Sequence, residues 1–217
     1  MTTEITRTRG RPRGFDSVAA LRTAQQLFHA KGYDAVSVAD LTKALGINPP
    51  SFYAAFGSKA ALYRRILDQY AETGAVPLQQ ILRADRPLSE SLAELLEFAA
   101  RTYADPAASG CMVLEGTRSN EAEAREAACV FHVAAQDVIR SFIAKHHPAD
   151  ADRLADFVCT TMAGLSASAR HGQTLERLQS TARLAGTALA QDPGVQVGNG
   201  PDAEARKKKL SSTPPRN

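Results

Sequence analysis

The sequence has few of the residues that mark secreted, membrane-spanning or zinc-binding proteins. Its 217 residues include only three cysteines, Cys111, Cys129 and Cys159, too few and too scattered for a disulfide framework or a zinc-finger spacing. No run of 18 apolar residues occurs, so we expect no transmembrane helix. The N-terminal MTTEITRTRGRPRG is charged but has no apolar segment after it, unlike a secretory signal. These absences favour a cytoplasmic protein with reduced thiols.

Sequence patterns of common catalytic and cofactor sites are also missing. No GxSxG, P-loop, GxGxxG or HExxH motif is present. An enzyme built on a helical bundle, with Cys111 as nucleophile and a histidine as base, stays an alternative that rests on one cysteine. His146 and His147 are adjacent, so on a helix they point about 100° apart and cannot ligate one metal from one face. We therefore expect no metal and no cofactor.

Charge is divided unevenly along the chain. The formal net charge is only +3, but residues 1–70 carry +5, residues 71–200 carry −5 and residues 201–217 carry +3. Such asymmetry favours a polyanion as the partner of the first third, although solvated surface charge is the simpler alternative. The tail lysines, Lys207 to Lys209, could add nonspecific DNA affinity, but a solvated terminus is the preferred interpretation.

Apolar periodicity predicts an all-α fold. Stripes at helical spacing recur from Phe15 to about residue 191, and no stretch alternates like a strand beyond a few residues. The sequence predicts four parts: a flexible basic arm (1–14), a helix-turn-helix domain (15–60), a helical effector-binding and dimerisation domain (61–191) and a disordered tail (192–217).

The most informative segment runs from Ser37 to Lys59, SVADLTKALGINPPSFYAAFGSK. Ser37 is a good N-cap for a short helix ending at Leu45, and Asn48 caps the next, with Pro49 at its first position. Two short helices joined by Leu-Gly-Ile-Asn make a helix-turn-helix, whose second helix fits the major groove of DNA. Its apolar residues are expected to form a small core: Leu41, Leu45, Ile47, Phe52 and Phe56.

This segment resembles the DNA-binding domain of the tetracycline-repressor-like (TetR) family. The resemblance covers about residues 15–65 and rests on FHAKGYDAVSV, DLTKALGI and NPPSFYAAFGSKAAL. The family usually has a small residue where Pro50 stands, and we expect the Pro-Pro pair to stiffen the start of the helix. The resemblance implies a homodimer that binds a palindromic DNA operator, represses transcription, and is released by a small molecule bound in an all-helical C-terminal domain.

The resemblance also implies roles for individual residues. Tyr33, Ser37, Lys43 and Lys59 are expected to contact phosphate, and the arm arginines to enter a minor groove unless they are merely solvated. Residues at the start of the second helix are expected to reach phosphates or base edges. The full set of expected DNA contacts is Arg9, Arg11, Arg13, Tyr33, Ser37, Lys43, Asn48, Pro49, Pro50, Ser51, Tyr53 and Lys59.

The C-terminal part is expected to hold the effector pocket and the dimer interface. For each candidate residue, ordinary core packing is the alternative. The pocket candidates are Phe98, Tyr103, Cys111, Met112, Phe131, His132 and Phe157. The dimer candidates are Leu154, Phe157, Met162, Leu165, Leu175, Leu178 and Leu189.

Two interpretations remain open from sequence. Ser109–Leu114 resembles a stretch of one TetR-like subgroup, and its Cys111 is either a redox-sensitive thiol or, as we prefer, a small buried hydrophobe. A DNA-binding regulator without any small-molecule effector is a further alternative to the inducible repressor.

Overall fold

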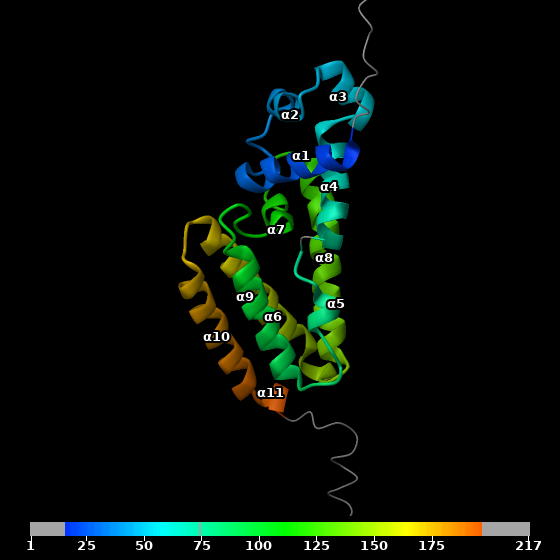
Figure 1. The fold of residues 1–217 in the computed structure, drawn as a ribbon. Coiled ribbons are helices and arrows are strands. Elements are labelled where there is room, and N and C mark those ends of the chain that lie inside the picture. Colours follow the sequence, from blue (N-terminus) through cyan, green and yellow to red (C-terminus); the bar gives the residue numbers. More distant parts are fainter. Residues whose placement is uncertain (1–15, 74, 197–217) are drawn as a thin grey trace, which may run out of the picture.

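Every regular element in residues 16–73 and 75–196, the residues that the computed structural model describes, is a helix (Figure 1). The all-α prediction is thus confirmed. The elements are α1 (Ser17–Lys31), α2 (Val38–Leu45), α3 (Pro49–Phe56), α4 (Lys59–Thr73), α5 (Leu78–Ile81), α6 (Leu88–Tyr103), α7 (Met112–Gly116), α8 (Ala122–Ala144), the 3-10 turn η1 (Pro148–Asp150), α9 (Ala151–Arg170), α10 (Leu175–Gln191) and α11 (Pro193–Gln196).

Local signals place the first four helices. Asp16 caps α1 by accepting from two backbone N–H groups, and Ser37 forms a capping box with Asp40 at the start of α2. Gly46 ends α2 in the left-handed region at φ 65°. Asn48 then caps α3, and Ser58 Oγ accepts from Ala61 N in the first turn of α4. These caps satisfy backbone donors that would otherwise lack partners.

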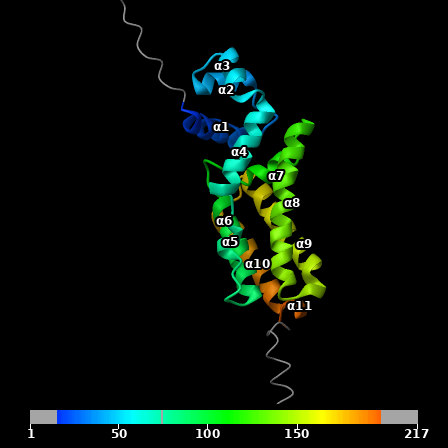
Figure 2. The ribbon, with the colours of Figure 1, turned by 90° about the vertical axis from the view of Figure 1, so that its right-hand side faces the viewer.

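The C-terminal body is a helical bundle in which α6 packs against α9 and α10, and α9 packs against α8. Figure 2 shows α6, α9 and α10 below the first three helices, whereas the upper end of α8 reaches up to their level. Helices α6 and α10 pack closely, because a Cβ added to Gly186 would lie 3.0 Å from Ala93 Cβ. A single apolar core cluster includes residues of both parts of the chain.

Helices α4 and α7 join the two parts. Helix α4 begins beside α1 and α3 and continues downward along α8 (Figures 1 and 2). Helix α7 packs so closely on this pair that a Cβ added to Gly116 would lie 2.4 Å from Tyr63 Oη and 2.7 Å from Ala128 Cβ. Tyr63 Oη also donates to Met112 O at 3.3 Å. Only a glycine fits at the end of α7 without moving α4 or α8.

Helix α8 has the length and apolar composition to cross a membrane, a point that the absence of an 18-residue apolar run did not anticipate. The helix contacts α4, α5, α7, α9 and η1, and one face of it lines a cavity described below. These contacts place α8 within the bundle, although only 28% of its apolar window is buried there.

Two short elements and one boundary differ from the sequence prediction. Helices α5 and α7, of four and five residues, are too short to show an apolar period. The segment expected to be a tail from residue 192 begins instead with α11, whose Val195 is buried. The remainder of the expected tail and the expected arm lie outside the described residues.

Candidate nucleic-acid interface and effector cavity

The start of α3 and the end of α2 form an exposed polar surface. Asn48, Pro49, Pro50 and Ser51 are all exposed, and so is Lys43 in the last turn of α2. Asn48 Oδ1 accepts from Ser51 N at 2.9 Å, so part of its polar capacity is used in capping. The surface also carries the N–H groups and positive dipole end of α3, which favour phosphate.

Two neighbouring aromatic residues of α3 have opposite environments. The Phe52 side chain is fully buried, whereas Tyr53 is 51% exposed. Phe56 is buried with Phe52 against the rest of the small domain, and the two rings lie 5.4 Å apart. The sequence prediction of a small core is confirmed for Leu41, Phe52 and Phe56, and Leu45 and Ile47 pack against it. Tyr53 is thereby left on the surface.

Ser37, Tyr33 and Lys59 have partners within the chain. Ser37 Oγ donates to Asp40 Oδ2 at 2.6 Å and accepts from Asp40 N, as its capping role requires. Tyr33 is buried, and its hydroxyl donates to Glu121 Oε2 at 3.0 Å. The contact of these residues with DNA stays a prediction.

Glu121, just before α8, binds Lys59 as well. Lys59 Nζ lies 3.0 Å from Glu121 Oε1 and 3.3 Å from Tyr33 O, and it sits 4.0 Å from the centre of the Tyr33 ring. The Lys59 side chain is only 14% exposed. The Glu121 carboxylate therefore binds both Tyr33 and Lys59, two groups that were expected to contact phosphate.

A second carboxylate also links the DNA-binding part to the body. This one belongs to the DNA-binding part, whereas Glu121 belongs to the body. Asp34, which follows Tyr33, accepts from Ser119 Oγ at 2.6 Å and from Asn120 N at 2.9 Å. These hydrogen bonds lower the pKa of the Asp34 carboxyl below its ordinary value. The loop between α7 and α8 is thus bound to the loop between α1 and α2 at three consecutive residues, 119 to 121.

The last turn of α1 is also bound to the body, through His29. A ring N of His29 lies 3.1 Å from Gly110 O, and Arg170 Nη1 donates to both His29 O and Ser109 O at 3.0 Å. Arg170 also pairs with Glu115 of α7 at 3.2 Å. Gly110 has φ 77°, and a Cβ there would lie 2.8 Å from Arg170 Cγ. The segment before α7 therefore contacts α1 and α9 together.

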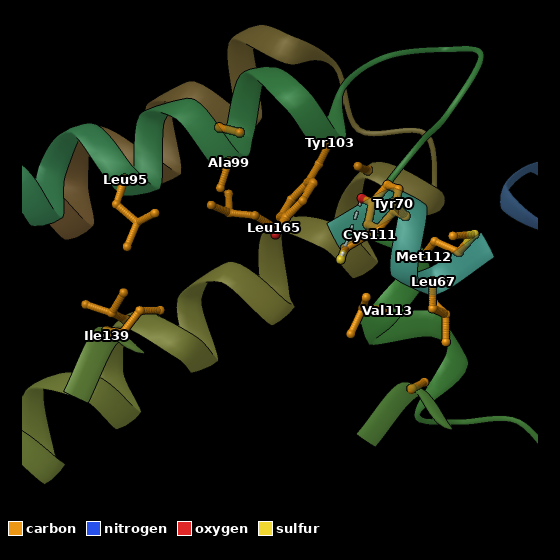
Figure 3. Packing of buried hydrophobic residues seen from close by; sticks show 14 of the residues in the cluster. Leu67, Tyr70, Leu95, Ala99, Tyr103, Cys111, Met112, Val113, Ile139 and Leu165 are labelled. Carbon is orange, nitrogen blue, oxygen red and sulfur yellow. Dashed lines mark hydrogen bonds between the residues drawn. The ribbon is translucent and has the colours of Figure 1, made fainter. Parts of the chain in front are cut away.

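A cavity of about 420 Å³ lies inside the body. Its walls come from the end of α4, the segment leading into α5, the end of α6, the residue before α7, and single faces of α8 and α9. Helices α5 and α7 themselves also supply walls. Figure 3 shows Tyr103, Cys111, Val113 and Ile139 of this cavity among the buried apolar residues around them. Tyr70 Oη donates to Cys111 Sγ at 3.9 Å. Binding pockets for small molecules are commonly of this size and apolar character.

Four of the expected pocket residues line this cavity: Tyr103, Cys111, Phe131 and His132. Phe98 and Met112 are not among its walls, because Phe98 packs against the core and Met112 is buried there. Phe157 is 41% exposed and is likewise not a wall. Burial raises the pKa of the Cys111 thiol, which agrees with its interpretation as a small buried hydrophobe.

Burial separates the expected dimer residues into two groups. Leu154, Leu165, Leu178 and Leu189 are buried in the core of a single subunit, and their part in a dimer interface stays a prediction. Met162 is partly buried and lines the cavity. Phe157 of α9 and Leu175 of α10 are exposed, and both remain candidates.

Sequence reasoning missed several residues that the structure brings to these sites. Leu184 of α10 is 72% exposed, and it was missed because it lies off the apolar stripe that faces the core. Glu121 and Asp34 were missed because their partners are 62 to 88 residues away in sequence. Cys159 also lines the cavity, and no local signal in the sequence marked it. The arm residues Arg9, Arg11 and Arg13 lie outside the described residues.

Comparison with known proteins gives consistent matches. A model of bacterial regulatory proteins of the tetR family matches residues 20–66. The chain is 50% identical over 190 residues to the HTH-type transcriptional repressor BdcR of Escherichia coli (strain K12), covering 87% of this chain and 96% of the relative. It is 29% identical to the repressor ComR of the same organism, over 85% of this chain and 92% of that one.

A solved structure extends the similarity to the whole fold. A cysteine mutant of the TetR family transcriptional regulator CifR, in complex with 26 base pairs of double-strand operator DNA, matches with a TM-score of 0.75 and 31% identity. The match covers 82% of this chain and 99% of the CifR chain.

Proposed function

Because the chain belongs to the TetR family and is a transcriptional repressor rather than an enzyme, we propose that it binds a palindromic operator as a homodimer and releases the DNA when a small molecule fills its cavity. One observation carries this proposal. The exposed polar surface of α3 lies over the buried Phe52 and Phe56, which leaves Tyr53 and the N-terminal turn of α3 open to DNA.

In this proposal α3 enters the major groove, which is wide enough for one helix. Asn48, Ser51 and Tyr53 contact phosphates or base edges, and Pro49 and Pro50 hold the first turn rigid. Lys43 of α2 approaches the backbone of the DNA. The operator complex of CifR supports DNA as the partner of this fold.

Lys59 and Tyr33 would reach phosphate only by exchanging a partner. Both groups are bound to the Glu121 carboxylate, whose charge and geometry resemble those of a phosphate oxygen pair. We propose that operator phosphate displaces Glu121 from Lys59. The two contacts then link DNA binding to the position of the loop before α8.

Dimerisation is proposed through the outer faces of α9 and α10. Phe157, Thr160 and Gly164 follow one another at helical spacing on α9 and are exposed, and α10 presents Leu184. A Cβ added to Gly164 would meet no atom within 4 Å, so this face has room for a neighbouring helix. Two recognition helices on one molecule are needed because a single short helix contacts too little DNA for tight, selective binding.

Release of DNA is proposed to start at the segment before α7. Cys111 is a wall of the cavity, and the preceding Gly110 O accepts from His29 of α1. A molecule that presses on Cys111 therefore moves a segment bonded directly to the DNA-binding part. The alternative of a regulator without an effector predicts DNA binding that no cavity ligand changes.

The DNA proposal is tested by fluorescence anisotropy with labelled DNA from the region upstream of the protein's own gene, and with operators selected from a random library. We expect nanomolar, salt-sensitive binding and at least a hundredfold preference over scrambled DNA. Equal affinity for operator and scrambled DNA would contradict the proposal.

The dimer proposal is tested by sedimentation velocity. Phe157→Asp and Leu184→Asp are expected to shift the dimer to monomer while helicity is kept, because both side chains are exposed in one subunit. Arg22→Asp on α1 is the matched control and should leave the dimer intact. Dimers in all three variants would place the interface elsewhere.

A further inference from the structure

The walls of the cavity carry almost no formal charge. Among the 21 lining residues that the structure describes, Glu72 is the only aspartate or glutamate, and no lysine or arginine is present. Three glutamines, one histidine, one tyrosine and two cysteines are the remaining polar or weakly acidic groups. A positive group that could pair with a bound carboxylate or phosphate is therefore missing from these walls.

The titratable walls are neutral as well. Burial raises the pKa of the Cys111 thiol, the pKa of Cys159 to about 11 and the pKa of Tyr103 well above its ordinary value. Burial lowers the pKa of His132, so its imidazole is neutral near pH 7. These groups offer hydrogen bonds but no charge to a ligand.

Charge and depth are ordered along the cavity. Tyr103, Cys111 and Ile139 are buried and form its inner end, whereas Glu72, Gln79 and Gln80 are exposed and mark its mouth. An anion would pass the Glu72 carboxylate and then lose its hydration without gaining a counter-charge. Burying an unpaired charge costs far more than burying a neutral polar group that keeps one hydrogen bond.

We propose that the effector of this protein is a neutral, mainly apolar small molecule and that carboxylates and phosphates are excluded from the cavity. This inference rests on the proposed function, because it takes the cavity as the effector site. The volume of about 420 Å³ lies toward the small end of the range for ligand pockets, so a ligand of one or two rings fits. Tyr103 and His132 supply the hydrogen bonds for a single polar group.

The test compares two probes of nearly equal shape, neutral 2-naphthalenemethanol and anionic 2-naphthoate. Their dissociation constants are measured by isothermal titration calorimetry, and stabilisation of the full chain by scanning calorimetry. We expect the alcohol to bind at least tenfold more tightly than the carboxylate. Equal binding, tighter binding of the carboxylate, or no binding of either probe would overturn the proposal.

A charge variant tests whether repulsion by Glu72, and not the shape of the probe, weakens naphthoate binding. Glu72→Lys should strengthen naphthoate binding at least fivefold and leave the alcohol nearly unchanged, because it places a cation at the mouth. Glu126→Lys on the exposed side of α8 makes the same charge change away from the cavity and should alter neither probe. A similar gain in both variants would show general electrostatics rather than a property of the cavity, and would contradict the proposal.

A variant that fills the cavity tests whether the alcohol binds there. Ala135→Phe fills the cavity from α8 and should abolish binding of the alcohol, whereas Ala122→Phe, on an exposed turn of the same helix, should not. Undiminished binding in Ala135→Phe would overturn the cavity as the binding site.

Operator affinity of each variant is measured separately by anisotropy. The proposal of a neutral ligand is contradicted if the carboxylate binds as tightly as the alcohol, or more tightly, while DNA binding and its release are kept. The proposed function fails if DNA binding is absent, whatever the probes do.

Discussion

The DNA-facing surface and the cavity differ in how many segments of the chain form them and in their polarity. The surface around α3 is formed by one continuous segment, residues 43–53, and is polar, exposed and held by caps within a few residues. The cavity takes its walls from five separate segments between residues 71 and 162 and is apolar and nearly uncharged. The first can be altered one side chain at a time, whereas the second depends on how distant helices pack.

The contrast is sharpest between Phe52 and Tyr53, so the largest effect is expected from Phe52→Ala. Removing a fully buried aromatic side chain should lower the free energy of unfolding by about 3–5 kcal/mol. Chemical denaturation followed by circular dichroism measures it. A loss below about 1 kcal/mol would mean that this small core does not hold α3 in place.

Tyr53→Ala should have the reverse profile, with little loss of stability and a fall in operator affinity of about 10- to 100-fold, corresponding to about 1–3 kcal/mol. Half of the Tyr53 side chain is already exposed, so little packing is lost. Anisotropy and thermal melting are measured together, with the exposed Gln26→Ala of α1 as control. Unchanged affinity would remove Tyr53 from the interface.

The junction of the two regions should respond to pH through His29. Burial, with a smaller effect of Arg170, lowers the pKa of His29 below its ordinary 6.5 although Gly110 O and Asp105 act in the opposite direction. The unfolded chain therefore takes up a proton below pH 6.5 that the folded chain refuses, and stability falls as pH falls, by at most about 1.4 kcal/mol per pH unit.

His29→Gln should reduce this loss, measured as the change in Tm between pH 7.5 and 5.5. His132 contributes in the same direction, because burial also lowers its pKa, so part of the loss remains. The exposed His171→Gln is the control. An unchanged pH dependence in His29→Gln would exclude His29 as its source.

The smallest effect is expected from Glu121→Gln. If operator phosphate displaces this carboxylate from Lys59, removing its charge should raise DNA affinity about two- to fivefold, within the range of a partly exposed ion pair. Glu123→Gln makes the same charge change two residues away on an exposed position. A fall in affinity would mean that Glu121 orients Lys59 for DNA.

The sequence predicts the two regions unequally. Ser37 and Asn48 are visible as caps because each acts within three residues, so the starts of α2 and α3 are correctly predicted. Apolar periodicity also predicts helices up to about residue 191, where α10 ends, but it cannot tell a core leucine from an interface leucine. Leu178 is therefore buried in its own subunit, whereas Leu184, off the stripe, is exposed.

Contacts between residues far apart in the sequence could not be predicted from local sequence patterns. Lys59 meets Glu121 across 62 residues and Arg170 meets His29 across 141. Such contacts follow from how α1 and α4 lie on the body, and a single sequence carries no periodic sign of that arrangement. The cavity was only partly predicted for the same reason, since Phe98 and Met112 are apolar like its true walls but face elsewhere.

The hydrogen bonds between Asp34 and residues 119–120 bear on how such repressors could be recombined. A DNA-binding domain grafted from a relative onto this body would bring its own residue at position 34 to a loop that offers only donors there. Unless that residue is an acceptor of the right length, the graft leaves Ser119 and the Asn120 backbone unmatched. Exchange of operator specificity between relatives is then limited by whether the loop after α1 fits residues 119–121. A chimera that keeps Tyr33, Asp34 and Lys59 from this chain is the one to make first.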